Sequence, residues 1–304
     1  DCGIRYHLSP IRSNKAAILL FPFRLQALVM RFHPDVLHTH TEVPDLGLYL
    51  WSIIFGWLYP GIRVIKTIHN NELWNSWKGI GSHAEKFYIR NTPIAISRST
   101  MESYKMSYGA SAPIICNGLE EVPQAAFDGI EPGKTNILFA GRFEAQKGID
   151  VLCEVVRKLS GHRDIVFHIV GSGSLSAMVD QLRELPNIRI YDKIFGLSGR
   201  LGSFSYLFMP SVHEGLSLMS IEASLAGLPA IINPCPGLAE TLPEDWPLAV
   251  KDNSADGFVD IISHLSRYDR DALGEAAHRY AKEHFSIETM QRRYESVYGY
   301  EPND

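Results

Sequence analysis

The sequence predicts an α/β protein with parallel sheets, divided into two domains. Short apolar runs alternate with helical stretches along the chain, and polar loops join them, which is the order that βαβ units produce. The clearest unit covers residues 206–233, where the apolar run Tyr206–Met209 is followed by a loop, a helical stretch at 216–226 and a second apolar run, Ala230–Ile232. A length of 304 residues is enough for two domains of ordinary size.

Composition and charge narrow the class of protein. The chain is 45% apolar and 21% charged, which are the values of a globular protein. Lys and Arg outnumber Asp and Glu by 12 to 9 in residues 1–122, whereas the remainder has 17 against 25. Neither half contains a cluster of basic residues, so we expect no nucleic-acid partner. The small positive excess of the first half leaves contact with an acidic membrane surface open.

The four cysteines, Cys2, Cys116, Cys153 and Cys235, have neither paired nor metal-ligand spacing. Cys116 and Cys153 lie in apolar runs, which is typical of buried thiols in a reducing compartment. The sequence contains no signal-peptide pattern, and its longest apolar run, residues 46–59, is too short to span a bilayer. We therefore expect a cytoplasmic protein, with contact at the inner face of the cell membrane left open.

The first half reads as a series of strands and helices. The stretch 46–59 carries Trp51 and Trp57 and is interpreted as a helix packed on the sheet; a membrane-interface or acceptor-tail surface is the alternative. The other expected elements are strands at 3–8, 34–40, 64–68, 94–97 and 114–118, and helices at 16–32 and Arg98–Tyr108.

Three histidines lie near the ends of these strands. His38 falls within a predicted strand and is interpreted as a core histidine. His40 falls at the carboxyl end of the same strand, where α/β sheets place ligands, so a binding role and a structural role are both open. His69 follows the next strand in the same way and is the stronger candidate.

A change of composition separates the two halves. Residues 120–133 contain Pro123 and Pro132 and few apolar positions, so we interpret them as a linker. The predicted domains are residues 1–122, residues 123–284 and a terminal helix at 285–304. For the second half we expect strands at 136–141, Ile165–Val170 and Ile188–Tyr191 besides the two named above, and helices at 149–159, 272–283 and 286–298.

Cations and glycines follow the first two strands of the second domain. Arg142 comes directly after Gly141 at a strand end, and Lys147 just precedes a helix, so both cations are directed at one place. Gly171 and Gly173 follow the next strand, where a Gly-x-Gly pair lets a nucleotide approach the backbone. The third glycine of a dinucleotide fingerprint is missing.

Two carboxylates flank the start of the helical stretch at 216–226. Glu214 lies in the loop before it, and Glu222 lies one to two turns into the helix. Ser217 can cap the first turn, and Gly215 allows close approach to the helix N-terminus, which favours anions. We therefore predict an anion site at this end of the helix.

The motif from His213 to Ala223, His-Glu-Gly-Leu-Ser-Leu-Met-Ser-Ile-Glu-Ala, is followed by Gly-Leu-Pro. It resembles the Glu-x7-Glu signature of the retaining, GT-B-fold nucleotide-sugar glycosyltransferases, family 4 (glycosyl transferases group 1). The resemblance covers almost the whole chain from Ile4 onward and implies two Rossmann-like domains facing each other across a cleft. An earlier strand and glycine-rich loop usually come first, so the N-terminal domain is expected to be short by about one βα unit. The helix at 285–304 would cross back to the first domain.

The resemblance also implies a role for each candidate residue. Arg142 and Lys147 would hold the donor diphosphate, Glu222 the ribose, and Glu214 hydroxyl groups of the transferred sugar. His69 would face the sugar, and His40 would lie on the acceptor side. The remaining donor-binding positions are Gly141, Gly171, Gly173, Gly215, Leu216 and Ser217.

The implied function is retaining transfer of a sugar from a nucleotide-diphosphate sugar to a glycan or lipid-linked acceptor, in bacterial cell-envelope or exopolysaccharide synthesis. The resemblance implies no metal or other cofactor, and a UDP-sugar is the first donor to consider. A nucleotide-sugar 2-epimerase of the same fold and a non-catalytic GT-B-like partner subunit are the alternatives. Gly237 begins a segment similar to the family's Gly-x-x-Glu, where it would either approach the sugar or form a plain turn.

Overall fold

The computed structural model describes residues 15–74 and 78–299 and forms two compact units. The first consists of Asp1–Ile96 and Thr100–Ile114, and the second of Ser97–Ser99 and Ile115–Asp304. Each unit has its own parallel sheet. The strand expected at residues 3–8 and the expected shortness of the first domain fall outside the described residues.

The first unit contains a three-stranded parallel sheet in the order β1-β2-β3, with Leu37 opposite Val64 and Thr67 opposite Ile94. The stretch 46–59 divides into the helix α2 and a short 3-10 turn, η1. A Cβ at Gly47 of α2 would lie 2.4 Å from a ring carbon of Phe21, so this glycine lets α1 and α2 pack closely. The elements are α1 (Lys15–Phe32), β1 (Val36–Thr39), α2 (Glu42–Ile54), η1 (Gly56–Leu58), β2 (Arg63–Ile68), α3 (Lys78–Ile89), β3 (Thr92–Ala95) and α4 (Arg98–Tyr108).

A buried cluster of charged side chains lies in the core of the first unit. The Lys66 Nζ is 2.6 Å from an oxygen of Glu85 and 3.3 Å from an oxygen of Asp45, and all three side chains are buried. Trp74 Nε1 and Tyr104 OH donate to the Glu85 carboxylate, both at 2.8 Å. One ammonium faces two carboxylates here, and burial raises the pKa of Asp45 to about 6.

One expected strand of the first unit is absent. The sequence predicts a strand at residues 114–118, but Ile114 makes only an isolated parallel bridge with Ala95. The chain leaves the sheet there because Leu119 bridges to Ser286 instead, and the Leu119 N–H donates to the carbonyl oxygen of Phe285 at 2.8 Å. The strand prediction is therefore wrong.

The boundary between the units lies earlier than the expected position at residue 122. The second unit begins at Ile115, apart from the short piece Ser97–Ser99. A main-chain contact explains the difference, because Leu119 bridges to Ser286 and so joins the second unit before residue 122. Residues 109–134, all described, form no helix or strand, which agrees with a linker at 120–133.

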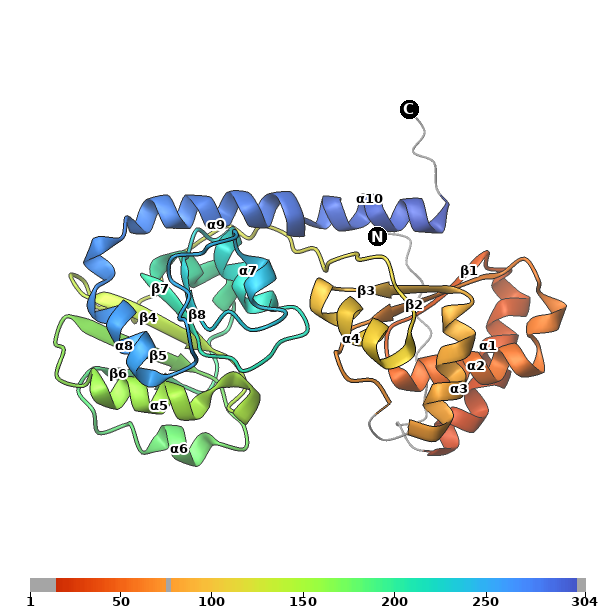
Figure 1. Ribbon diagram of the computed structural model, residues 1–304, viewed down its shortest axis with the longest axis horizontal. Coiled ribbons are helices and arrows are strands. Elements are labelled where there is room, and N and C mark those ends of the chain that lie inside the picture. Colours follow the sequence, from red (N-terminus) through yellow and green to blue (C-terminus); the bar gives the residue numbers. More distant parts are fainter. Residues whose placement is uncertain (1–14, 75–77, 300–304) are drawn as a thin grey trace. The chain divides into compact units, whose positions relative to one another are not determined.

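The second unit is built on a five-stranded parallel sheet in the order β6-β5-β4-β7-β8, with β4 at its centre. Helices α5 and α6 cover one face, and α7 and α9 cover the other (Figure 1). The strands and helices predicted for this half are confirmed, and α6, η3 and α8 are present in addition to them. The main elements of the unit are β4 (Thr135–Ala140), α5 (Ile149–Lys158), β5 (Ile165–Val170), α6 (Ser176–Asp180), β6 (Ile188–Tyr191), η3 (Leu197–Ser203), β7 (Tyr206–Met209), α7 (Leu218–Leu225), β8 (Ala230–Ile232), α8 (Ala255–Ser263), α9 (Arg270–Phe285) and α10 (Ile287–Tyr298).

The strand β5 is buried along its whole length, as expected for a parallel strand covered on both faces. It carries His168, whose Nε2 lies 2.9 Å from Oδ1 of Asn136. The rings of Tyr191 and Phe204 pack against this imidazole. Burial lowers the pKa of His168 to about 4, so it is neutral at pH 7.

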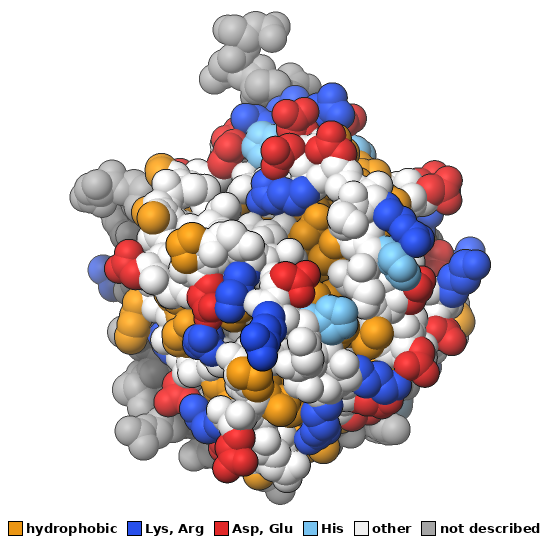
Figure 2. All heavy atoms as spheres, turned by 90° about the vertical axis from the view of Figure 1, so that its left-hand side faces the viewer, with side chains coloured by type: hydrophobic (Ala, Val, Ile, Leu, Met, Phe, Trp, Pro, Cys, Tyr) orange, Lys and Arg blue, Asp and Glu red, His pale blue; other side chains and the backbone are white. Residues whose placement is uncertain are grey.

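Two remaining features of the fold are the distribution of charge on its surface and the helix at its C-terminal end. Basic and acidic side chains are interspersed on the face that Figure 2 shows, and they form no single-sign field there. Among the described helices, none combines the length and the apolar character needed to cross a membrane. The terminal helix expected at 285–304 is present as α10 (Ile287–Tyr298), and its return to the first domain stays a prediction.

Candidate functional site

The loops that follow β4 and β7 pack directly on each other in the second unit. Gly148 has a φ of +67°, and a Cβ there would lie 2.1 Å from the carbonyl oxygen of Pro210, so this approach requires glycine. The Val212 N–H donates to the Gln146 carbonyl at 2.8 Å, and the Gln146 side chain donates to the His213 carbonyl at 3.0 Å. The two loops therefore form one surface at the carboxyl edge of the sheet, where α/β proteins bind ligands.

An ion pair between Lys147 and Glu214 lies at the centre of this surface. The Lys147 Nζ is 2.6 Å from Oε1 of Glu214, and the Ser211 hydroxyl donates to the same oxygen at 2.9 Å. Because the Lys147 side chain is 19% exposed and that of Glu214 only 8%, salt screens the pair little. A lysine ammonium has three donors, so Lys147 can hold Glu214 and a further anion together. Its Cδ lies 3.8 Å from the place of a Cβ on Gly141.

The predicted helix start is present in shorter form, since α7 begins at Leu218 with Ser217 as its cap. The Ser217 hydroxyl accepts from the N–H of Ser220, which confirms the predicted capping. The Ser217 N–H donates to the Gly237 carbonyl at 2.9 Å. Gly237 has a φ of +76°, and a Cβ there would lie 2.2 Å from the carbonyl oxygen of Glu214. This turn therefore fixes the loop that carries Glu214.

Glu222 lies half-buried on α7, and its Oε2 accepts from the Ser198 hydroxyl at 2.6 Å. Ser198 belongs to η3, which follows the loop after β6. The carbonyl oxygen of Gly215 accepts from the Ser97 hydroxyl at 2.6 Å, and Leu216 is buried. The predicted donor-binding positions on and before α7 are thus held by contacts within the second unit.

The glycines after β5 support the loop that carries Arg142. A Cβ at Gly171 would lie 1.9 Å from the Gly141 carbonyl oxygen, and one at Gly173 would lie 2.6 Å from that of Phe143. Both glycines are therefore needed for contact between two loops, whether or not a nucleotide is bound. Arg142 itself is exposed, and within the described residues it makes no ion pair.

The first unit brings its candidate histidines together. His40 Nδ1 lies 3.2 Å from His69 Nε2, and the rings of His38 and His40 are 4.2 Å apart. His38 Nε2 lies 2.8 Å from the Thr67 hydroxyl. Burial lowers the pKa of all three imidazoles, to about 4 for His38, so neutral rings can share hydrogens at pH 7. His38 makes a polar contact as well as packing, which the interpretation as a core histidine leaves out.

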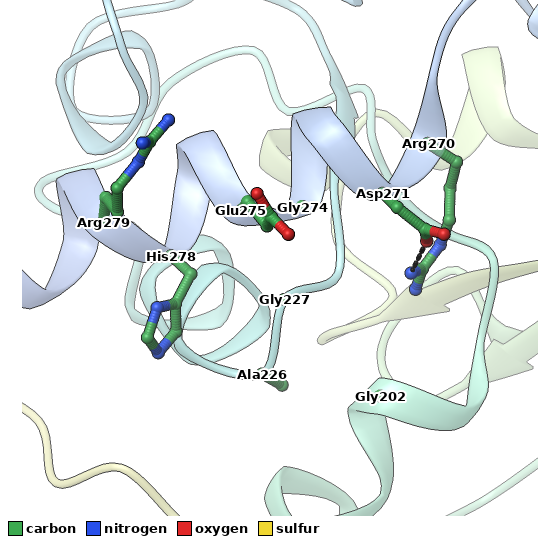
Figure 3. A pocket seen from close by; sticks show the side chains of 9 residues that line it. All are labelled: Gly202, Ala226, Gly227, Arg270, Asp271, Gly274, Glu275, His278 and Arg279. Carbon is green, nitrogen blue, oxygen red and sulfur yellow. Dashed lines mark hydrogen bonds and ion pairs between the residues drawn. The ribbon is translucent and has the colours of Figure 1, made fainter.

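The second unit also has a groove that is separate from the surface formed by the loops after β4 and β7. The groove in Figure 3 has a volume of about 560 Å³ and lies beside α9 and the end of α7 marked by Gly227. It contains none of the predicted site residues, and its Arg270 already contacts Asp271 and the carbonyl of Phe204. Among the described residues, no three His, Cys, Asp or Glu side chains are placed to hold a metal ion.

Sequence reasoning missed the side chains that hold the site together. Ser211 and Ser198 hold Glu214 and Glu222, and no motif distinguished these serines from other loop serines. Lys66, in the core of the first unit, could have been found from the sequence. A lysine inside the apolar strand Arg63–Ile68 indicates a buried charge that needs a partner.

Two family models match the chain. Residues 2–121 match the model described as Glycosyltransferase Family 4, and residues 134–267 match Glycosyl transferases group 1. Together they cover both units apart from the linker and the terminal helices.

Known proteins agree with this match. An uncharacterized glycosyltransferase of Methanocaldococcus jannaschii is 25% identical over 87% of this chain and 75% of its own length. The O-antigen biosynthesis glycosyltransferase WclY of Escherichia coli is 22% identical over 87% of this chain and 78% of its own. The Anabaena protein HepE, solved in complex with UDP, has a TM-score of 0.74 at 13% identity, over 94% of this chain and 84% of its own. The chain belongs to the glycosyltransferases of family 4, group 1, and has their GT-B fold.

Proposed function

We propose that this glycosyltransferase moves a sugar from a nucleotide-diphosphate sugar to a glycan or lipid-linked acceptor with retention of configuration at the anomeric carbon. The bond between that carbon and the diphosphate oxygen breaks, and the acceptor oxygen forms its bond on the same face. The departing phosphate takes the acceptor's proton. The observation that carries the proposal is the ion pair between the partly buried Lys147 and the buried Glu214 at the carboxyl edge of β4 and β7.

The pair suits a diphosphate for an electrostatic reason. Negative charge develops on the departing diphosphate, and a cation already fixed in place stabilises it without reorganisation. Lys147 is oriented by Glu214, and Arg142 is exposed on the same loop and makes no ion pair within the described residues. Each charge-assisted hydrogen bond would contribute about 1.5–3 kcal/mol.

The other candidate residues have narrower roles. Glu222 would accept hydrogen bonds from the ribose hydroxyls, and Glu214 would contact hydroxyl groups of the transferred sugar while holding Lys147. His69 would face the sugar, with His40 beside it on the acceptor side. No metal is required in this scheme. The UDP bound by HepE and the O-antigen assignment of WclY support a UDP-sugar donor and an envelope polysaccharide as the first pair to test.

Substitution of the cations tests this assignment. We expect Lys147→Gln and Arg142→Gln each to lower turnover about 10²–10³-fold, measured as release of nucleoside diphosphate in the presence of acceptor. The matched control is Lys158→Gln, because Lys158 also pairs with carboxylates but on the exposed side of α5. If Lys147→Gln turns over like the native protein, the diphosphate is held elsewhere.

The donor and the stereochemistry need separate measurements. A ligand at 100 times its dissociation constant stabilises a protein by about 2.7 kcal/mol, so a thermal-shift panel of UDP-, GDP-, ADP- and dTDP-sugars identifies the base. NMR of the product tests retention. Conversion of the donor without any acceptor would instead indicate an epimerase. The cytoplasmic location and peripheral membrane contact through the first domain remain predictions.

A further inference from the structure

A groove of about 550 Å³ lies in the first unit, away from its candidate histidines. It runs between the end of α2 with η1 on one side and α3 on the other. Ile62 and Val64 line it where β2 begins, whereas His69 follows the opposite end of that strand. The groove is therefore separate from the site described above.

The walls of the groove are aromatic and fixed by contacts within the unit. The rings of Trp51 and Tyr59 stack with centroids 5.8 Å apart. Gln26 holds both, because its side chain accepts from Trp51 Nε1 at 3.0 Å and donates to the Tyr59 hydroxyl at 2.7 Å. On the facing side, Phe87 packs against Tyr49 with centroids 5.9 Å apart. These apolar walls keep their shape without a ligand.

The rim of the groove is basic. Lys86 of α3 and Arg90, which directly follows this helix, line the groove and are both exposed, as is His83. No Asp or Glu is among the described lining residues, and in the part of the chain that the structure describes neither Lys86 nor Arg90 makes an ion pair. Two cations beside an apolar groove are complementary to an anionic head group attached to an apolar chain.

Exposed apolar side chains continue the groove onto the surface. Ile53 lines it and is 60% exposed, and Trp57 of η1 is 75% exposed. Ile54 and Leu58 are exposed beside them in the chain. Trp57 Nε1 donates to the Ile54 carbonyl at 3.0 Å, so its polar atom is satisfied and the ring can enter an apolar medium at little cost.

We propose that this surface docks the protein on a membrane of anionic phospholipid. Trp57, Ile53 and Ile54 enter the boundary between head groups and acyl chains, and Lys86 and Arg90 contact lipid phosphates. The inference deepens the proposed function, since a lipid-linked acceptor would be met at such a surface. Its test needs no turnover, so the two can fail separately.

The test is sedimentation of the whole protein with large vesicles. We expect binding to vesicles of equal parts phosphatidylglycerol and phosphatidylcholine, much weaker binding to phosphatidylcholine alone, and loss of binding in high salt. Lys86→Gln with Arg90→Gln should weaken binding about 25-fold, since each cation near an anionic surface contributes about fivefold. Trp57→Ser should weaken it at least about tenfold.

Matched controls come from the second unit, where Lys193 lies over the ring of Phe195 and that ring is 77% exposed. Phe195→Ser and Lys193→Gln remove the same chemistry from another surface and should leave vesicle binding unchanged. Turnover of Trp57→Ser with a soluble acceptor should equal that of the native protein. The proposal is overturned if the groove variants bind vesicles like the native chain, or if the Lys193 and Phe195 variants lose as much. It is equally overturned if the native protein does not bind vesicles and Trp57→Ser only abolishes its self-association.

Discussion

The imidazole of His168 illustrates how one buried residue links the fold to pH. Its native pKa of about 4 lies below the ordinary value of 6.5, because burial disfavours the charged ring and Arg189 adds to this effect against the opposing charge of Glu131. The unfolded chain therefore binds more protons between these two values. His168 stabilises the native state above pH 6.5, and this contribution is lost as the pH falls towards 4.

The stability of a variant measures this contribution. A shift of this size corresponds to about 3 kcal/mol. We expect the free energy of unfolding of the native protein to fall more steeply between pH 6.5 and 4 than that of His168→Gln, which can still bond Asn136 but does not titrate. Urea unfolding at several pH values gives both slopes. The comparison of the two proteins is needed because other groups also titrate in this range. The lowered pKa of His38 likewise makes the native state less stable as the pH falls, whereas the raised pKa of Asp45 has the opposite effect. Equal slopes would contradict the assignment.

At the scale of residues, sequence reasoning found the charged groups of the candidate site better than their partners. Lys147 and Glu214 could be predicted because each follows a strand at the same edge of the sheet, and the structure places them 2.6 Å apart. The cluster around Lys66 could not be assembled in advance, since its carboxylates come from two separate helices. Sequence spacing does not state which faces of those helices meet the strand.

At the scale of elements, the turn at Gly237 shows how the loop that carries Glu214 is held in place. Gly237→Ala would require a left-handed backbone at an L-residue and would place a Cβ 2.2 Å from the Glu214 carbonyl oxygen. Gly133→Ala requires a similar backbone, with a φ of +75°, but its Cβ would meet nothing within 4 Å. A comparison of the two variants therefore distinguishes the free-energy cost of backbone strain from that of a steric clash.

We expect Gly133→Ala to lower the free energy of unfolding by about 1–2 kcal/mol, the cost of the backbone conformation alone. Gly237→Ala should cost more and should also weaken stabilisation by UDP, because the loop carrying Glu214 must move. Urea unfolding and thermal shift with UDP measure the two effects. If UDP stabilises both variants equally, the turn has no part in donor binding.

Elements were predictable where the pattern of apolar residues was long or repeated. The strands and helices of the second unit follow alternating runs with clear stops, such as Gly227, whose φ of +68° ends α7. The failure at residues 114–118 has a different cause. Those residues are apolar enough for a strand. Leu119, however, pairs with Ser286, which lies at the far end of the second unit in sequence, and a local pattern does not encode such a distant contact.

At the scale of the whole molecule, the two units offer separate spectroscopic signals. Trp51, Trp57, Trp74 and Trp77 belong to the first unit and only Trp246 to the second. Since the proposed nucleotide contacts lie in the second unit, UDP should raise the unfolding temperature seen by far-ultraviolet circular dichroism more than that seen by tryptophan fluorescence. A Trp246→Phe variant sharpens the contrast, because its fluorescence reports on the first unit alone. Equal shifts by both probes would mean that the units unfold as one cooperative body.

The bridge between Leu119 and Ser286 has a further consequence. The polypeptide that enters at Leu119 builds the entire five-stranded sheet and comes back to its own starting point at Ser286. A segment whose entrance and exit touch can be spliced into another polypeptide without stretching either. Recombination at the codons of these two residues would thus carry the whole sheet of the second unit as a single cassette, free to be joined to a different first unit.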